Sequence, residues 1–297
     1  MKNATIIIPT RNDAKNMDAC LQACLNQDGY SKEKYDIMII DDVSTDSTAD
    51  VVEKYAKKYP GMITNIRLDK RIGRTKSLNL GIKKCNTPVF IELNADCIPE
   101  KNWLKGLMDG FTDEKVAVTK TTSIEEGASS AYRTELIKKL GMFDEGFNEM
   151  GSGFRMDSDI MFKILDAGYE IKRVYGTGYE HRHPKPTTMK GKIKYAFSRV
   201  KVHRFDPLLY KKHPQRTAKM LDIRFGFLRN PMTDFRTATG LWRGNGELEL
   251  GSPQGVRIIE NKTPVHAFII ILLGISYVIL VKLSRLYGSI KYGKLLI

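Results

Sequence analysis

The chain has 297 residues, of which 42% are hydrophobic, enough to bury one large core with an appendage beside it. Four cysteines occur without the spacing of a zinc site, which fits a reduced, cytosolic catalytic domain better than a disulfide framework. The formal net charge is +14, and the segment 182–229, with fourteen Lys and Arg against two Asp, contributes +12 of it. A localised basic block implies a polyanionic partner: membrane phosphates, a pyrophosphate-lipid or nucleic acid.

Strands and helices alternate through the first 120 residues. Short apolar, β-branched runs predict strands, and apolar residues three and four positions apart predict helices. The first residues lack the long apolar run of a signal peptide and are interpreted as a first strand. The expected strands are 6–9, 36–40, 63–68, 88–93 and 116–119, and the expected helices are 14–27, 46–58, 74–84 and 100–110. This succession predicts an α/β, Rossmann-like fold with a mostly parallel central sheet and helices on both faces.

The pattern changes after residue 127. Helices are expected at 134–140 and 157–167, with a returning strand at 169–174. The segment 190–205 carries apolar residues on one helical face and basic residues on the other. This pattern is typical of a basic helix at a membrane interface, and a core-packed amphipathic helix would look the same.

The segment 265–281 contains seventeen residues without a charge, at the lower limit for spanning a bilayer. If it spans with the catalytic domain in the cytosol, the basic tail lies outside, against the positive-inside tendency. An in-plane or re-entrant segment, bent at Gly274, and a buried dimer helix are the alternatives. The sequence thus predicts three parts: a catalytic domain over 1–181, a basic membrane-proximal region over 182–264, and a hydrophobic segment with a basic tail over 265–297.

Polar side chains follow three of the predicted strands at the points where these strands end. They are Pro9, Thr10 and Asn12 after the first strand, Asp41 and Asp42 after the second, and Asn94, Ala95 and Asp96 after the fourth. Each group alone could be an ordinary turn or helix cap. Because ligands bind beyond the carboxyl ends of parallel strands, the three groups together predict one polar crevice at a single sheet edge.

Two further groups of residues could serve that crevice. Arg71, Arg74 and Lys76 lie just upstream of the fourth strand and either contact a diphosphate or form a solvated helix face. Asp157 and Asp159 open a predicted helix, where they either stabilise the helix dipole or supply a general base.

The order of these motifs resembles family 2 glycosyltransferases with the GT-A fold, over about residues 4–181. The motifs are IPTRN, DDVSTDST, GRTKSLNLG, LNADCIPE, FDEGF and DSDIMFKILDAGY. The resemblance implies an inverting transfer from a nucleotide-sugar, in which an acceptor hydroxyl attacks the anomeric carbon opposite the leaving nucleoside diphosphate. Asp42 would contact the nucleoside, Asn94-Ala95-Asp96 would stand at the metal-diphosphate motif, and Asp157 would be the base. Asp159 is then assigned to helix capping.

The resemblance also implies a divalent metal, Mn²⁺ or Mg²⁺. Asp96 would bind it, together with His181, which ends the last core strand at a position where such enzymes often place a histidine. A surface role for His181, or a metal contact from His183 instead, is the alternative. Two departures from the family pattern stand out: Asn94 replaces the first carboxylate of the metal motif, and Met156 replaces the acidic neighbour of the base.

We therefore expect a membrane-associated glycosyltransferase with a nucleotide-sugar donor and a glycan, lipid-linked or polyprenyl-linked acceptor. Its catalytic domain is expected on the cytoplasmic side of the cell membrane, against the membrane surface. A non-catalytic membrane scaffold that kept the fold is one alternative, motivated by Asn94. A nucleic-acid-binding protein is another. No nucleic acid is expected, however, because the basic block lacks interleaved aromatic stacking motifs beyond Tyr195, Phe197 and Phe205.

Overall fold

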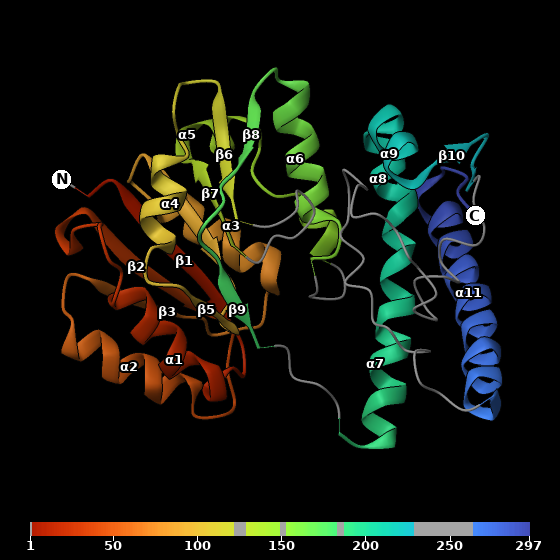
Figure 1. The fold of residues 1–297 in the computed structure, drawn as a ribbon, viewed down its shortest axis with the longest axis horizontal. Helices are drawn as coiled ribbons and strands as arrows, with labels where there is room; N and C mark the ends of the chain where they lie inside the picture. The colour runs from red at the N-terminus through yellow and green to blue at the C-terminus, as the bar shows by residue number, and fades with distance from the viewer. Residues whose placement is uncertain (1, 122–128, 149–152, 183–186, 229–263) are drawn as a thin grey trace. The chain divides into compact units, whose positions relative to one another are not determined.

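A computed structural model describes residues 2–121, 129–148, 153–182, 187–228 and 264–297 (Figure 1). The chain divides into two compact units, Met1–Pro184 and Lys185–Ile297. The boundary expected near residue 264 therefore falls inside the second unit. Each unit is described by itself below.

Seven strands form the central sheet of the first unit, in the order β3-β2-β1-β4-β7-β6-β8. Their bounds are β1 Ala4–Thr10, β2 Tyr35–Asp41, β3 Ile63–Arg67, β4 Val89–Leu93, β6 Val116–Lys120, β7 Ser129–Arg133 and β8 Glu170–Arg173. Neighbouring strands pair in parallel except at β7, which is antiparallel to both β4 and β6. The prediction of a mostly parallel sheet is confirmed. The sequence analysis missed β7, because its first residues, Ser129 and Ser130, are poor strand formers that owe their geometry to pairing on both sides.

Helices connect these strands in the predicted places, and most of them differ from the prediction only in the residues at which they begin or end. The structure has α1 Ala14–Leu25, α2 Thr48–Lys58, α3 Arg74–Lys84, α4 Trp103–Asp109, α5 Thr134–Lys139 and α6 Met156–Asp166, with short 3₁₀ turns at η1 Lys32–Lys34 and η2 Glu145–Asn148. Helix α2 begins two residues later than predicted. The Asp46 carboxylate stays outside it and accepts hydrogen bonds from the backbone N–H of Thr48 at 3.0 Å and from its hydroxyl at 2.5 Å.

The helices cover both faces of the sheet, and β1 shows why. Its side chains alternate between the faces, so Ile6 and Ile8 join the core beneath α1, which contributes Met17. Ile7 points to the opposite face and meets α3 at Gly81, where an added Cβ would lie 2.6 Å from the Ile7 Cγ2 atom. The expectation of helices on both faces is therefore confirmed.

A second, two-stranded sheet was not expected from the sequence. Strand β5, Cys97–Pro99, follows directly after β4, and it pairs antiparallel with β9, Tyr179–His181. Cys97 is the register partner of His181. This pairing brings the end of the first unit beside the loop that follows β4.

The second unit is mostly helical. It contains α7 Met189–Val202, η3 His203–Phe205, α8 Asp206–Lys212, α9 Pro214–Leu221, the hairpin β10 Ile223–Arg224 and β11 Phe227–Leu228, and α11 Pro264–Tyr292. Helix α7 corresponds to the predicted segment 190–205. Its predicted apolar face is divided, because Val200 is buried while Ile193 and Phe197 are 51% and 49% exposed.

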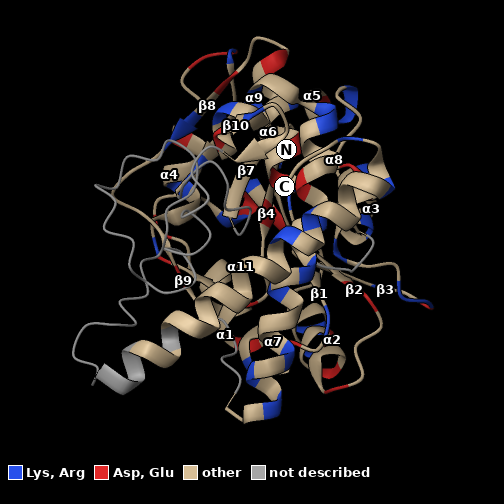
Figure 2. Ribbon diagram, turned by 90° about the vertical axis from the view of Figure 1, so that its right-hand side faces the viewer, with Lys and Arg blue, Asp and Glu red and all other residues tan. Residues whose placement is uncertain are grey.

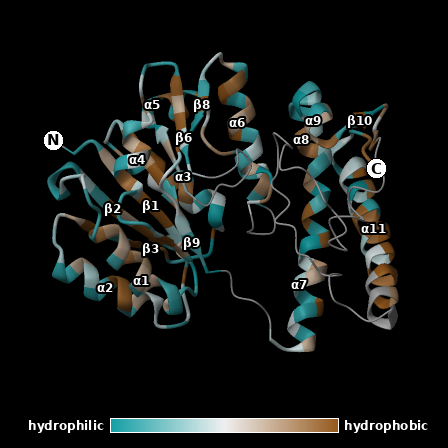
Figure 3. Cartoon of the chain, viewed as in Figure 1, coloured by the Kyte–Doolittle hydropathy of each residue, from teal (hydrophilic) through white to brown (hydrophobic). Residues whose placement is uncertain are grey.

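Helix α11 runs unbroken through Gly274, so the bend that this glycine would permit is absent from the helix. Figure 3 shows that hydrophobic residues follow one another along the helix. By length and composition, the part Ile271–Tyr292 of this helix could cross a membrane, and 22% of its apolar 18-residue stretch is buried. Of the predicted segment 182–264, the structure describes residues 182, 187–228 and 264.

Candidate functional site

Three strand ends meet at one edge of the main sheet, as the parallel pairing requires. Thr10 at the end of β1 is the register partner of Asp41 at the end of β2, and β4 flanks β1 on its other side. A cleft of about 320 Å³ opens there, at the lower end of the size range of small-molecule sites. It is lined by Pro9, Thr10, Arg11, Asp13, Asp42, Arg71, Gly73, Arg74, Ser77, Asn94, Ala95 and Asp96.

Eight of the predicted donor-binding residues belong to this lining, and Asn12 and Lys76 do not. The predicted base Asp157 and the predicted metal ligand His181 also lie outside it. The Asn12 side chain instead accepts a hydrogen bond from the backbone N–H of Thr45 at 2.8 Å, which ties the loop after β1 to the loop after β2. The Nζ atom of Lys76 lies 3.9 Å from the Oε2 atom of Glu145, so the two side chains form an ion pair. Asn12 and Lys76 therefore support the loops around the cleft.

The lining also includes Arg11, Asp13, Gly73 and Ser77, which are not among the predicted site residues, although Arg11, Gly73 and Ser77 belong to the motifs IPTRN and GRTKSLNLG. Asp13 accepts hydrogen bonds from the Thr10 hydroxyl at 3.0 Å and from the Arg11 backbone N–H at 3.2 Å. Burial raises its pKa, against these hydrogen bonds. Its place directly after the polar residues of the first strand end was the available signal.

Asp42 holds the loop before α3 in place. Its two carboxylate oxygens accept hydrogen bonds from the backbone N–H groups of Ile72, at 2.7 Å, and Gly73, at 2.8 Å. Gly73 has a φ of +85°, and a Cβ there would lie 2.6 Å from the Asn148 Oδ1 atom, so only glycine fits. Asp41, its neighbour, turns to the backbone N–H and hydroxyl of Ser44, which separates the two adjacent carboxylates.

Arg74 joins the cleft to a buried carboxylate that the sequence analysis did not identify. Its Nη2 atom lies 2.5 Å from the Oε1 atom of Glu92, whose side chain is fully buried, and 2.7 Å from the Oδ1 atom of Asn94. Burial raises the pKa of Glu92 to about 8, even though the Arg74 guanidinium opposes this shift. The amide at position 94 thus presents its carbonyl oxygen to a cation that already faces a carboxylate.

Asp157, the predicted base, stands in the first turn of α6 and is partly buried. It is close enough to the Arg74–Glu92 pair for its charge to raise the pKa of both. The residue directly before the helix is Arg155. Asp159 lies one helical turn before Lys163, and the two side chains form an ion pair at 2.8 Å. The buried Asp159 carboxylate therefore forms an ion pair within α6.

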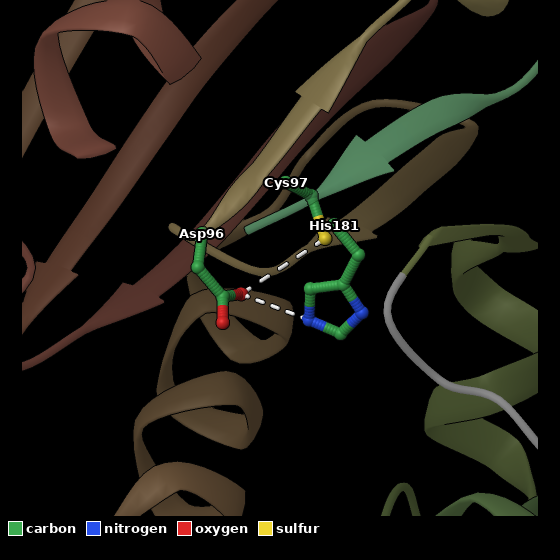
Figure 4. A group of neighbouring side chains, drawn as sticks. All are labelled: Asp96, Cys97 and His181. Atoms are coloured by element: carbon green, nitrogen blue, oxygen red, sulfur yellow. Dashed lines mark hydrogen bonds and ion pairs between the residues drawn. The ribbon is translucent and has the colours of Figure 1, made fainter. Parts of the chain in front are cut away.

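Asp96 and His181 point toward one another across the small sheet (Figure 4). The Oδ1 atom of Asp96 lies 3.2 Å from the Nε2 atom of His181, and the Sγ atom of Cys97 lies 4.0 Å from the same oxygen. Ligand atoms of all three residues fall within 4.8 Å of one another. Burial raises the pKa of the Cys97 thiol, which keeps it protonated and a poor ligand. A carboxylate oxygen and an imidazole nitrogen remain, and this donor set fits a divalent cation. His183 lies outside the described residues.

Comparisons with known proteins agree with this architecture. A family model described as Glycosyl transferase family 2 matches residues 5–168. The dolichyl N-acetyl-alpha-D-glucosaminyl phosphate 3-beta-D-2,3-diacetamido-2,3-dideoxy-beta-D-glucuronosyltransferase of Methanococcus voltae is 37% identical over 111 residues, which cover 37% of this chain and 34% of that protein. Glycosyltransferase AglE of Haloferax volcanii is 31% identical over 101 residues, covering 34% and 33%. The chain thus spans about a third of the length of these curated relatives.

Among solved structures, the mannosyltransferase PcManGT from Pyrobaculum calidifontis, in complex with GDP-Man and Mn²⁺, superposes with a TM-score of 0.65. The superposition covers 97% of this chain and 88% of that chain at 18% sequence identity. GalNAc-T7, solved with UDP, GalNAc and Mn²⁺, gives a TM-score of 0.55 over 73% of this chain and 51% of that chain at 16% identity. The family model covers more than half of the sequence, and these folds match, so the chain belongs to glycosyl transferase family 2 and has the GT-A fold.

Proposed function

We propose that this protein transfers a sugar from a nucleotide-sugar to a hydroxyl of a lipid-linked or cell-surface glycan acceptor, with inversion at the anomeric carbon. The observation that carries the proposal is the convergence of Thr10, Asp42 and Asp96, from three strand ends, in one cleft. Arg11, Arg71 and Arg74 line the same cleft. Three guanidinium groups beside carboxylates suit a ligand that combines phosphates with hydroxyls, as a nucleotide-sugar does.

In the reaction that we propose, Asp42 and the loop it holds receive the nucleoside. Arg71 and Arg74 contact the diphosphate, where their fixed positive charge stabilises the negative charge that develops on the leaving group. Arg74 is held for this task by the buried Glu92, since the close contact between the Arg74 Nη2 and Glu92 Oε1 atoms restricts the rotamers of Arg74.

Asp157 is proposed to take the proton of the acceptor hydroxyl as the hydroxyl oxygen forms its bond to the anomeric carbon. The nucleoside diphosphate leaves from the opposite face, which accounts for the inversion. The charge of Asp157 acts on Arg74 and Glu92, so the base stands beside the network that lines the cleft. Met156 stands where the family pattern has an acidic neighbour of the base. The buried side chain of Glu92, on another element, supplies a second acidic group nearby.

Asp96 and His181 would hold a divalent cation, Mn²⁺ or Mg²⁺, which supplies Lewis-acid stabilisation of the departing phosphate oxygens when bound. The amide of Asn94 would add at most a neutral carbonyl oxygen, and this oxygen already accepts a hydrogen bond from Arg74. We therefore assign the charged contacts of the cation to Asp96 alone.

The acceptor class rests on the relatives and on the second unit. Two relatives, from Methanococcus voltae and Staphylococcus aureus, are named for transfer to a dolichyl-linked sugar and to a poly(ribitol-phosphate). Both acceptors carry phosphate, which suits a chain with a strongly basic second unit. We propose that the enzyme works at the cytoplasmic side of the cell membrane, where the second unit contacts the membrane surface.

The test uses the full-length chain and a panel of nucleoside diphosphates with Mn²⁺, Mg²⁺ or no cation. One nucleoside diphosphate should raise the melting temperature, and more strongly with cation, because ligand binding stabilises the native state by mass action. Hydrolysis of the matching nucleotide-sugar should then follow. Lys76→Ala, outside the cleft lining, should retain binding, and Asp42→Asn should lose it. If no nucleoside diphosphate binds under any condition, the proposed function is wrong and a non-catalytic scaffold is favoured.

A further inference from the structure

We infer that α11 lies in the plane of one membrane leaflet, with both of its ends on the same side of the bilayer, and presents an apolar stripe to anionic lipid. This inference rests on the membrane association within the proposed function, and it is independent of the transferase chemistry. Five observations on the second unit carry it.

The second half of α11 is fixed to η3 and α8 by a buried ion pair. The Nε atom of Arg285 donates to the Asp206 carboxylate at 3.0 Å, and the Nδ1 atom of His203 lies 3.0 Å from the same oxygen. The side chains of Arg285 and Asp206 are 2% and 0% exposed. One turn further along α11, a Cβ on Gly288 would lie 2.1 Å from the backbone oxygen of Arg204, so the two backbones are in close contact. This half of the helix is thus packed on protein and cannot be surrounded by lipid.

The chain on either side of α11 returns to one place. The backbone N–H of Leu228 in the hairpin donates to the carbonyl of Ile297, at 3.2 Å, and the N–H of Ile297 donates to Gly226, at 3.0 Å. The segment 229–263 therefore starts beside the residues that follow α11 and must reach the opposite end of this helix. If α11 crossed the bilayer, that segment would have to cross it as well.

The composition of 229–263 is unlike that of a membrane-spanning segment. It contains nine charged residues, and its longest stretch without a charge is seven residues, 250–256. A transmembrane helix needs about 20 consecutive, mostly apolar residues, and each charge at the bilayer centre is costly. Both ends of α11 must then lie on the same side.

The face of α11 turned away from these contacts is apolar along nearly its whole length. Exposed apolar residues follow one another three or four positions apart along the middle of this face: Phe268, Leu272, Ile275, Ile279, Leu283, Leu286 and Ile290. Further exposed apolar residues flank this stripe and widen it: Ile269, Ile271, Leu273, Leu280 and Tyr287. At 1.5 Å per residue this stripe is about 33 Å long. Buried Gly274, Val281, Arg285 and Gly288 occupy the opposite side of the helix. A stripe on one face, with protein on the other, is the pattern of a helix lying in an interface.

Charge identifies the occupant of this stripe as an anionic leaflet. Residues 185–297 contain 21 Lys and Arg against six Asp and Glu, a net charge of +15, whereas residues 1–184 carry −1. Basic residues recur along α7, as Figure 2 shows, and they alternate there with the exposed Ile193, Tyr195 and Phe197. Lys and Arg beside exposed apolar and aromatic residues favour headgroup phosphates with acyl chains beneath them.

The test measures depth along the stripe. Full-length Leu272→Cys, Ile279→Cys and Leu286→Cys variants carry a nitroxide, and the accessibility of each nitroxide to oxygen and to a water-soluble nickel chelate reports its depth. The four native cysteines are buried, and an unsubstituted sample checks that they stay unlabelled. Val281→Cys, on the protein-facing side, is the matched control and should be accessible to neither reagent.

In phosphatidylcholine vesicles with 30% phosphatidylglycerol, the three stripe positions should show one common depth, within a few ångströms. In a spanning helix, successive positions would differ by about 10 Å along the bilayer normal, and this result would overturn the inference. Omitting phosphatidylglycerol should weaken vesicle binding at least tenfold. Equal vesicle binding without phosphatidylglycerol would contradict the lipid assignment. So would a second copy of the chain that shields the stripe nitroxides from oxygen in detergent-free solution. Nucleoside diphosphate binding by the same samples reports separately on the proposed function.

Discussion

The buried carboxylate of Glu92 should make the stability of the first unit depend on pH between about 4.5 and 8. In the unfolded chain this carboxyl group ionises near 4.5, whereas burial raises its pKa to about 8 in the folded protein. Between these values the folded state holds a proton that the unfolded state has released. The stability linked to this proton is fully present below pH 4.5 and is lost as the pH rises through 8.

The perturbation is Glu92→Gln, which keeps the shape and a hydrogen-bond acceptor for Arg74 but does not titrate. One pKa unit corresponds to about 1.4 kcal/mol, so between pH 5.5 and pH 8.5 the wild type should lose about 3 kcal/mol relative to the variant. Because the side chain is fully buried, solvent screening does not reduce this figure. For a unit of this size, it corresponds to a shift of roughly 6–12 °C in melting temperature.

Urea unfolding at the two pH values measures this difference. The chain has two tryptophans, and in a Trp242→Phe background the fluorescence of the buried Trp103 reports on the first unit. Glu53→Gln is the control, because Glu53 is exposed and has a lowered pKa, so it is ionised in both states across the range. A difference between wild type and Glu92→Gln that is constant with pH would refute the reasoning. A variant that becomes less stable at high pH would show that Arg74 keeps Glu92 ionised.

Four predictions concern the cleft and the start of α6. Asp157→Asn should lower the transfer rate by about 10²–10⁴-fold while donor affinity is kept, as rate and binding measurements on the same sample would show. Asp159→Asn should instead lower stability in urea unfolding, because its buried carboxylate pairs within α6; a dead Asp159→Asn beside an active Asp157→Asn would place the base two residues further on. Asp96→Ala should abolish the effect of Mn²⁺ on nucleoside diphosphate binding in a thermal shift, and an unchanged effect would remove the metal assignment. Asn94→Asp should keep activity and bind Mn²⁺ more tightly in an EPR titration, unless the amide is needed as a neutral acceptor for Arg74.

Much of the first unit was readable from local sequence. Strand β4 is an apolar run bounded by turn residues, and parallel pairing then forces the loops after β1, β2 and β4 to one edge. The cleft lining follows from that geometry, which is why most of the predicted cleft residues line it. Asn12 and Lys76 depart from it because their partners, Thr45 and Glu145, belong to loops whose approach the sequence pattern does not encode.

Features that depend on pairing between distant segments could not be predicted from local sequence patterns. The proximity of His181 to Asp96 was expected only from the resemblance to the family, because β9 is three residues long and the register of β9 with β5 is what brings the two residues together. Glu92 was hidden for another reason: it lies within an apolar strand, and its partner Arg74 is on the preceding helix. A single carboxylate in a fully buried strand does carry a signal, since it requires a cation somewhere in the fold.

The pairing of β5 with β9 also sets when, during synthesis, the cation site becomes possible. Asp96 and His181 are 85 positions apart, and the second of them lies three residues before the end of the first unit. At the usual 5–20 residues per second, about 4–17 s separate their emergence from the ribosome. A nascent chain can fold β1, β2 and β4 and form the arginine-lined cleft while the histidine is still being made. If Asp96 and His181 hold the cation as proposed, cation-dependent turnover of the donor has to wait until the first unit has been translated almost to its end.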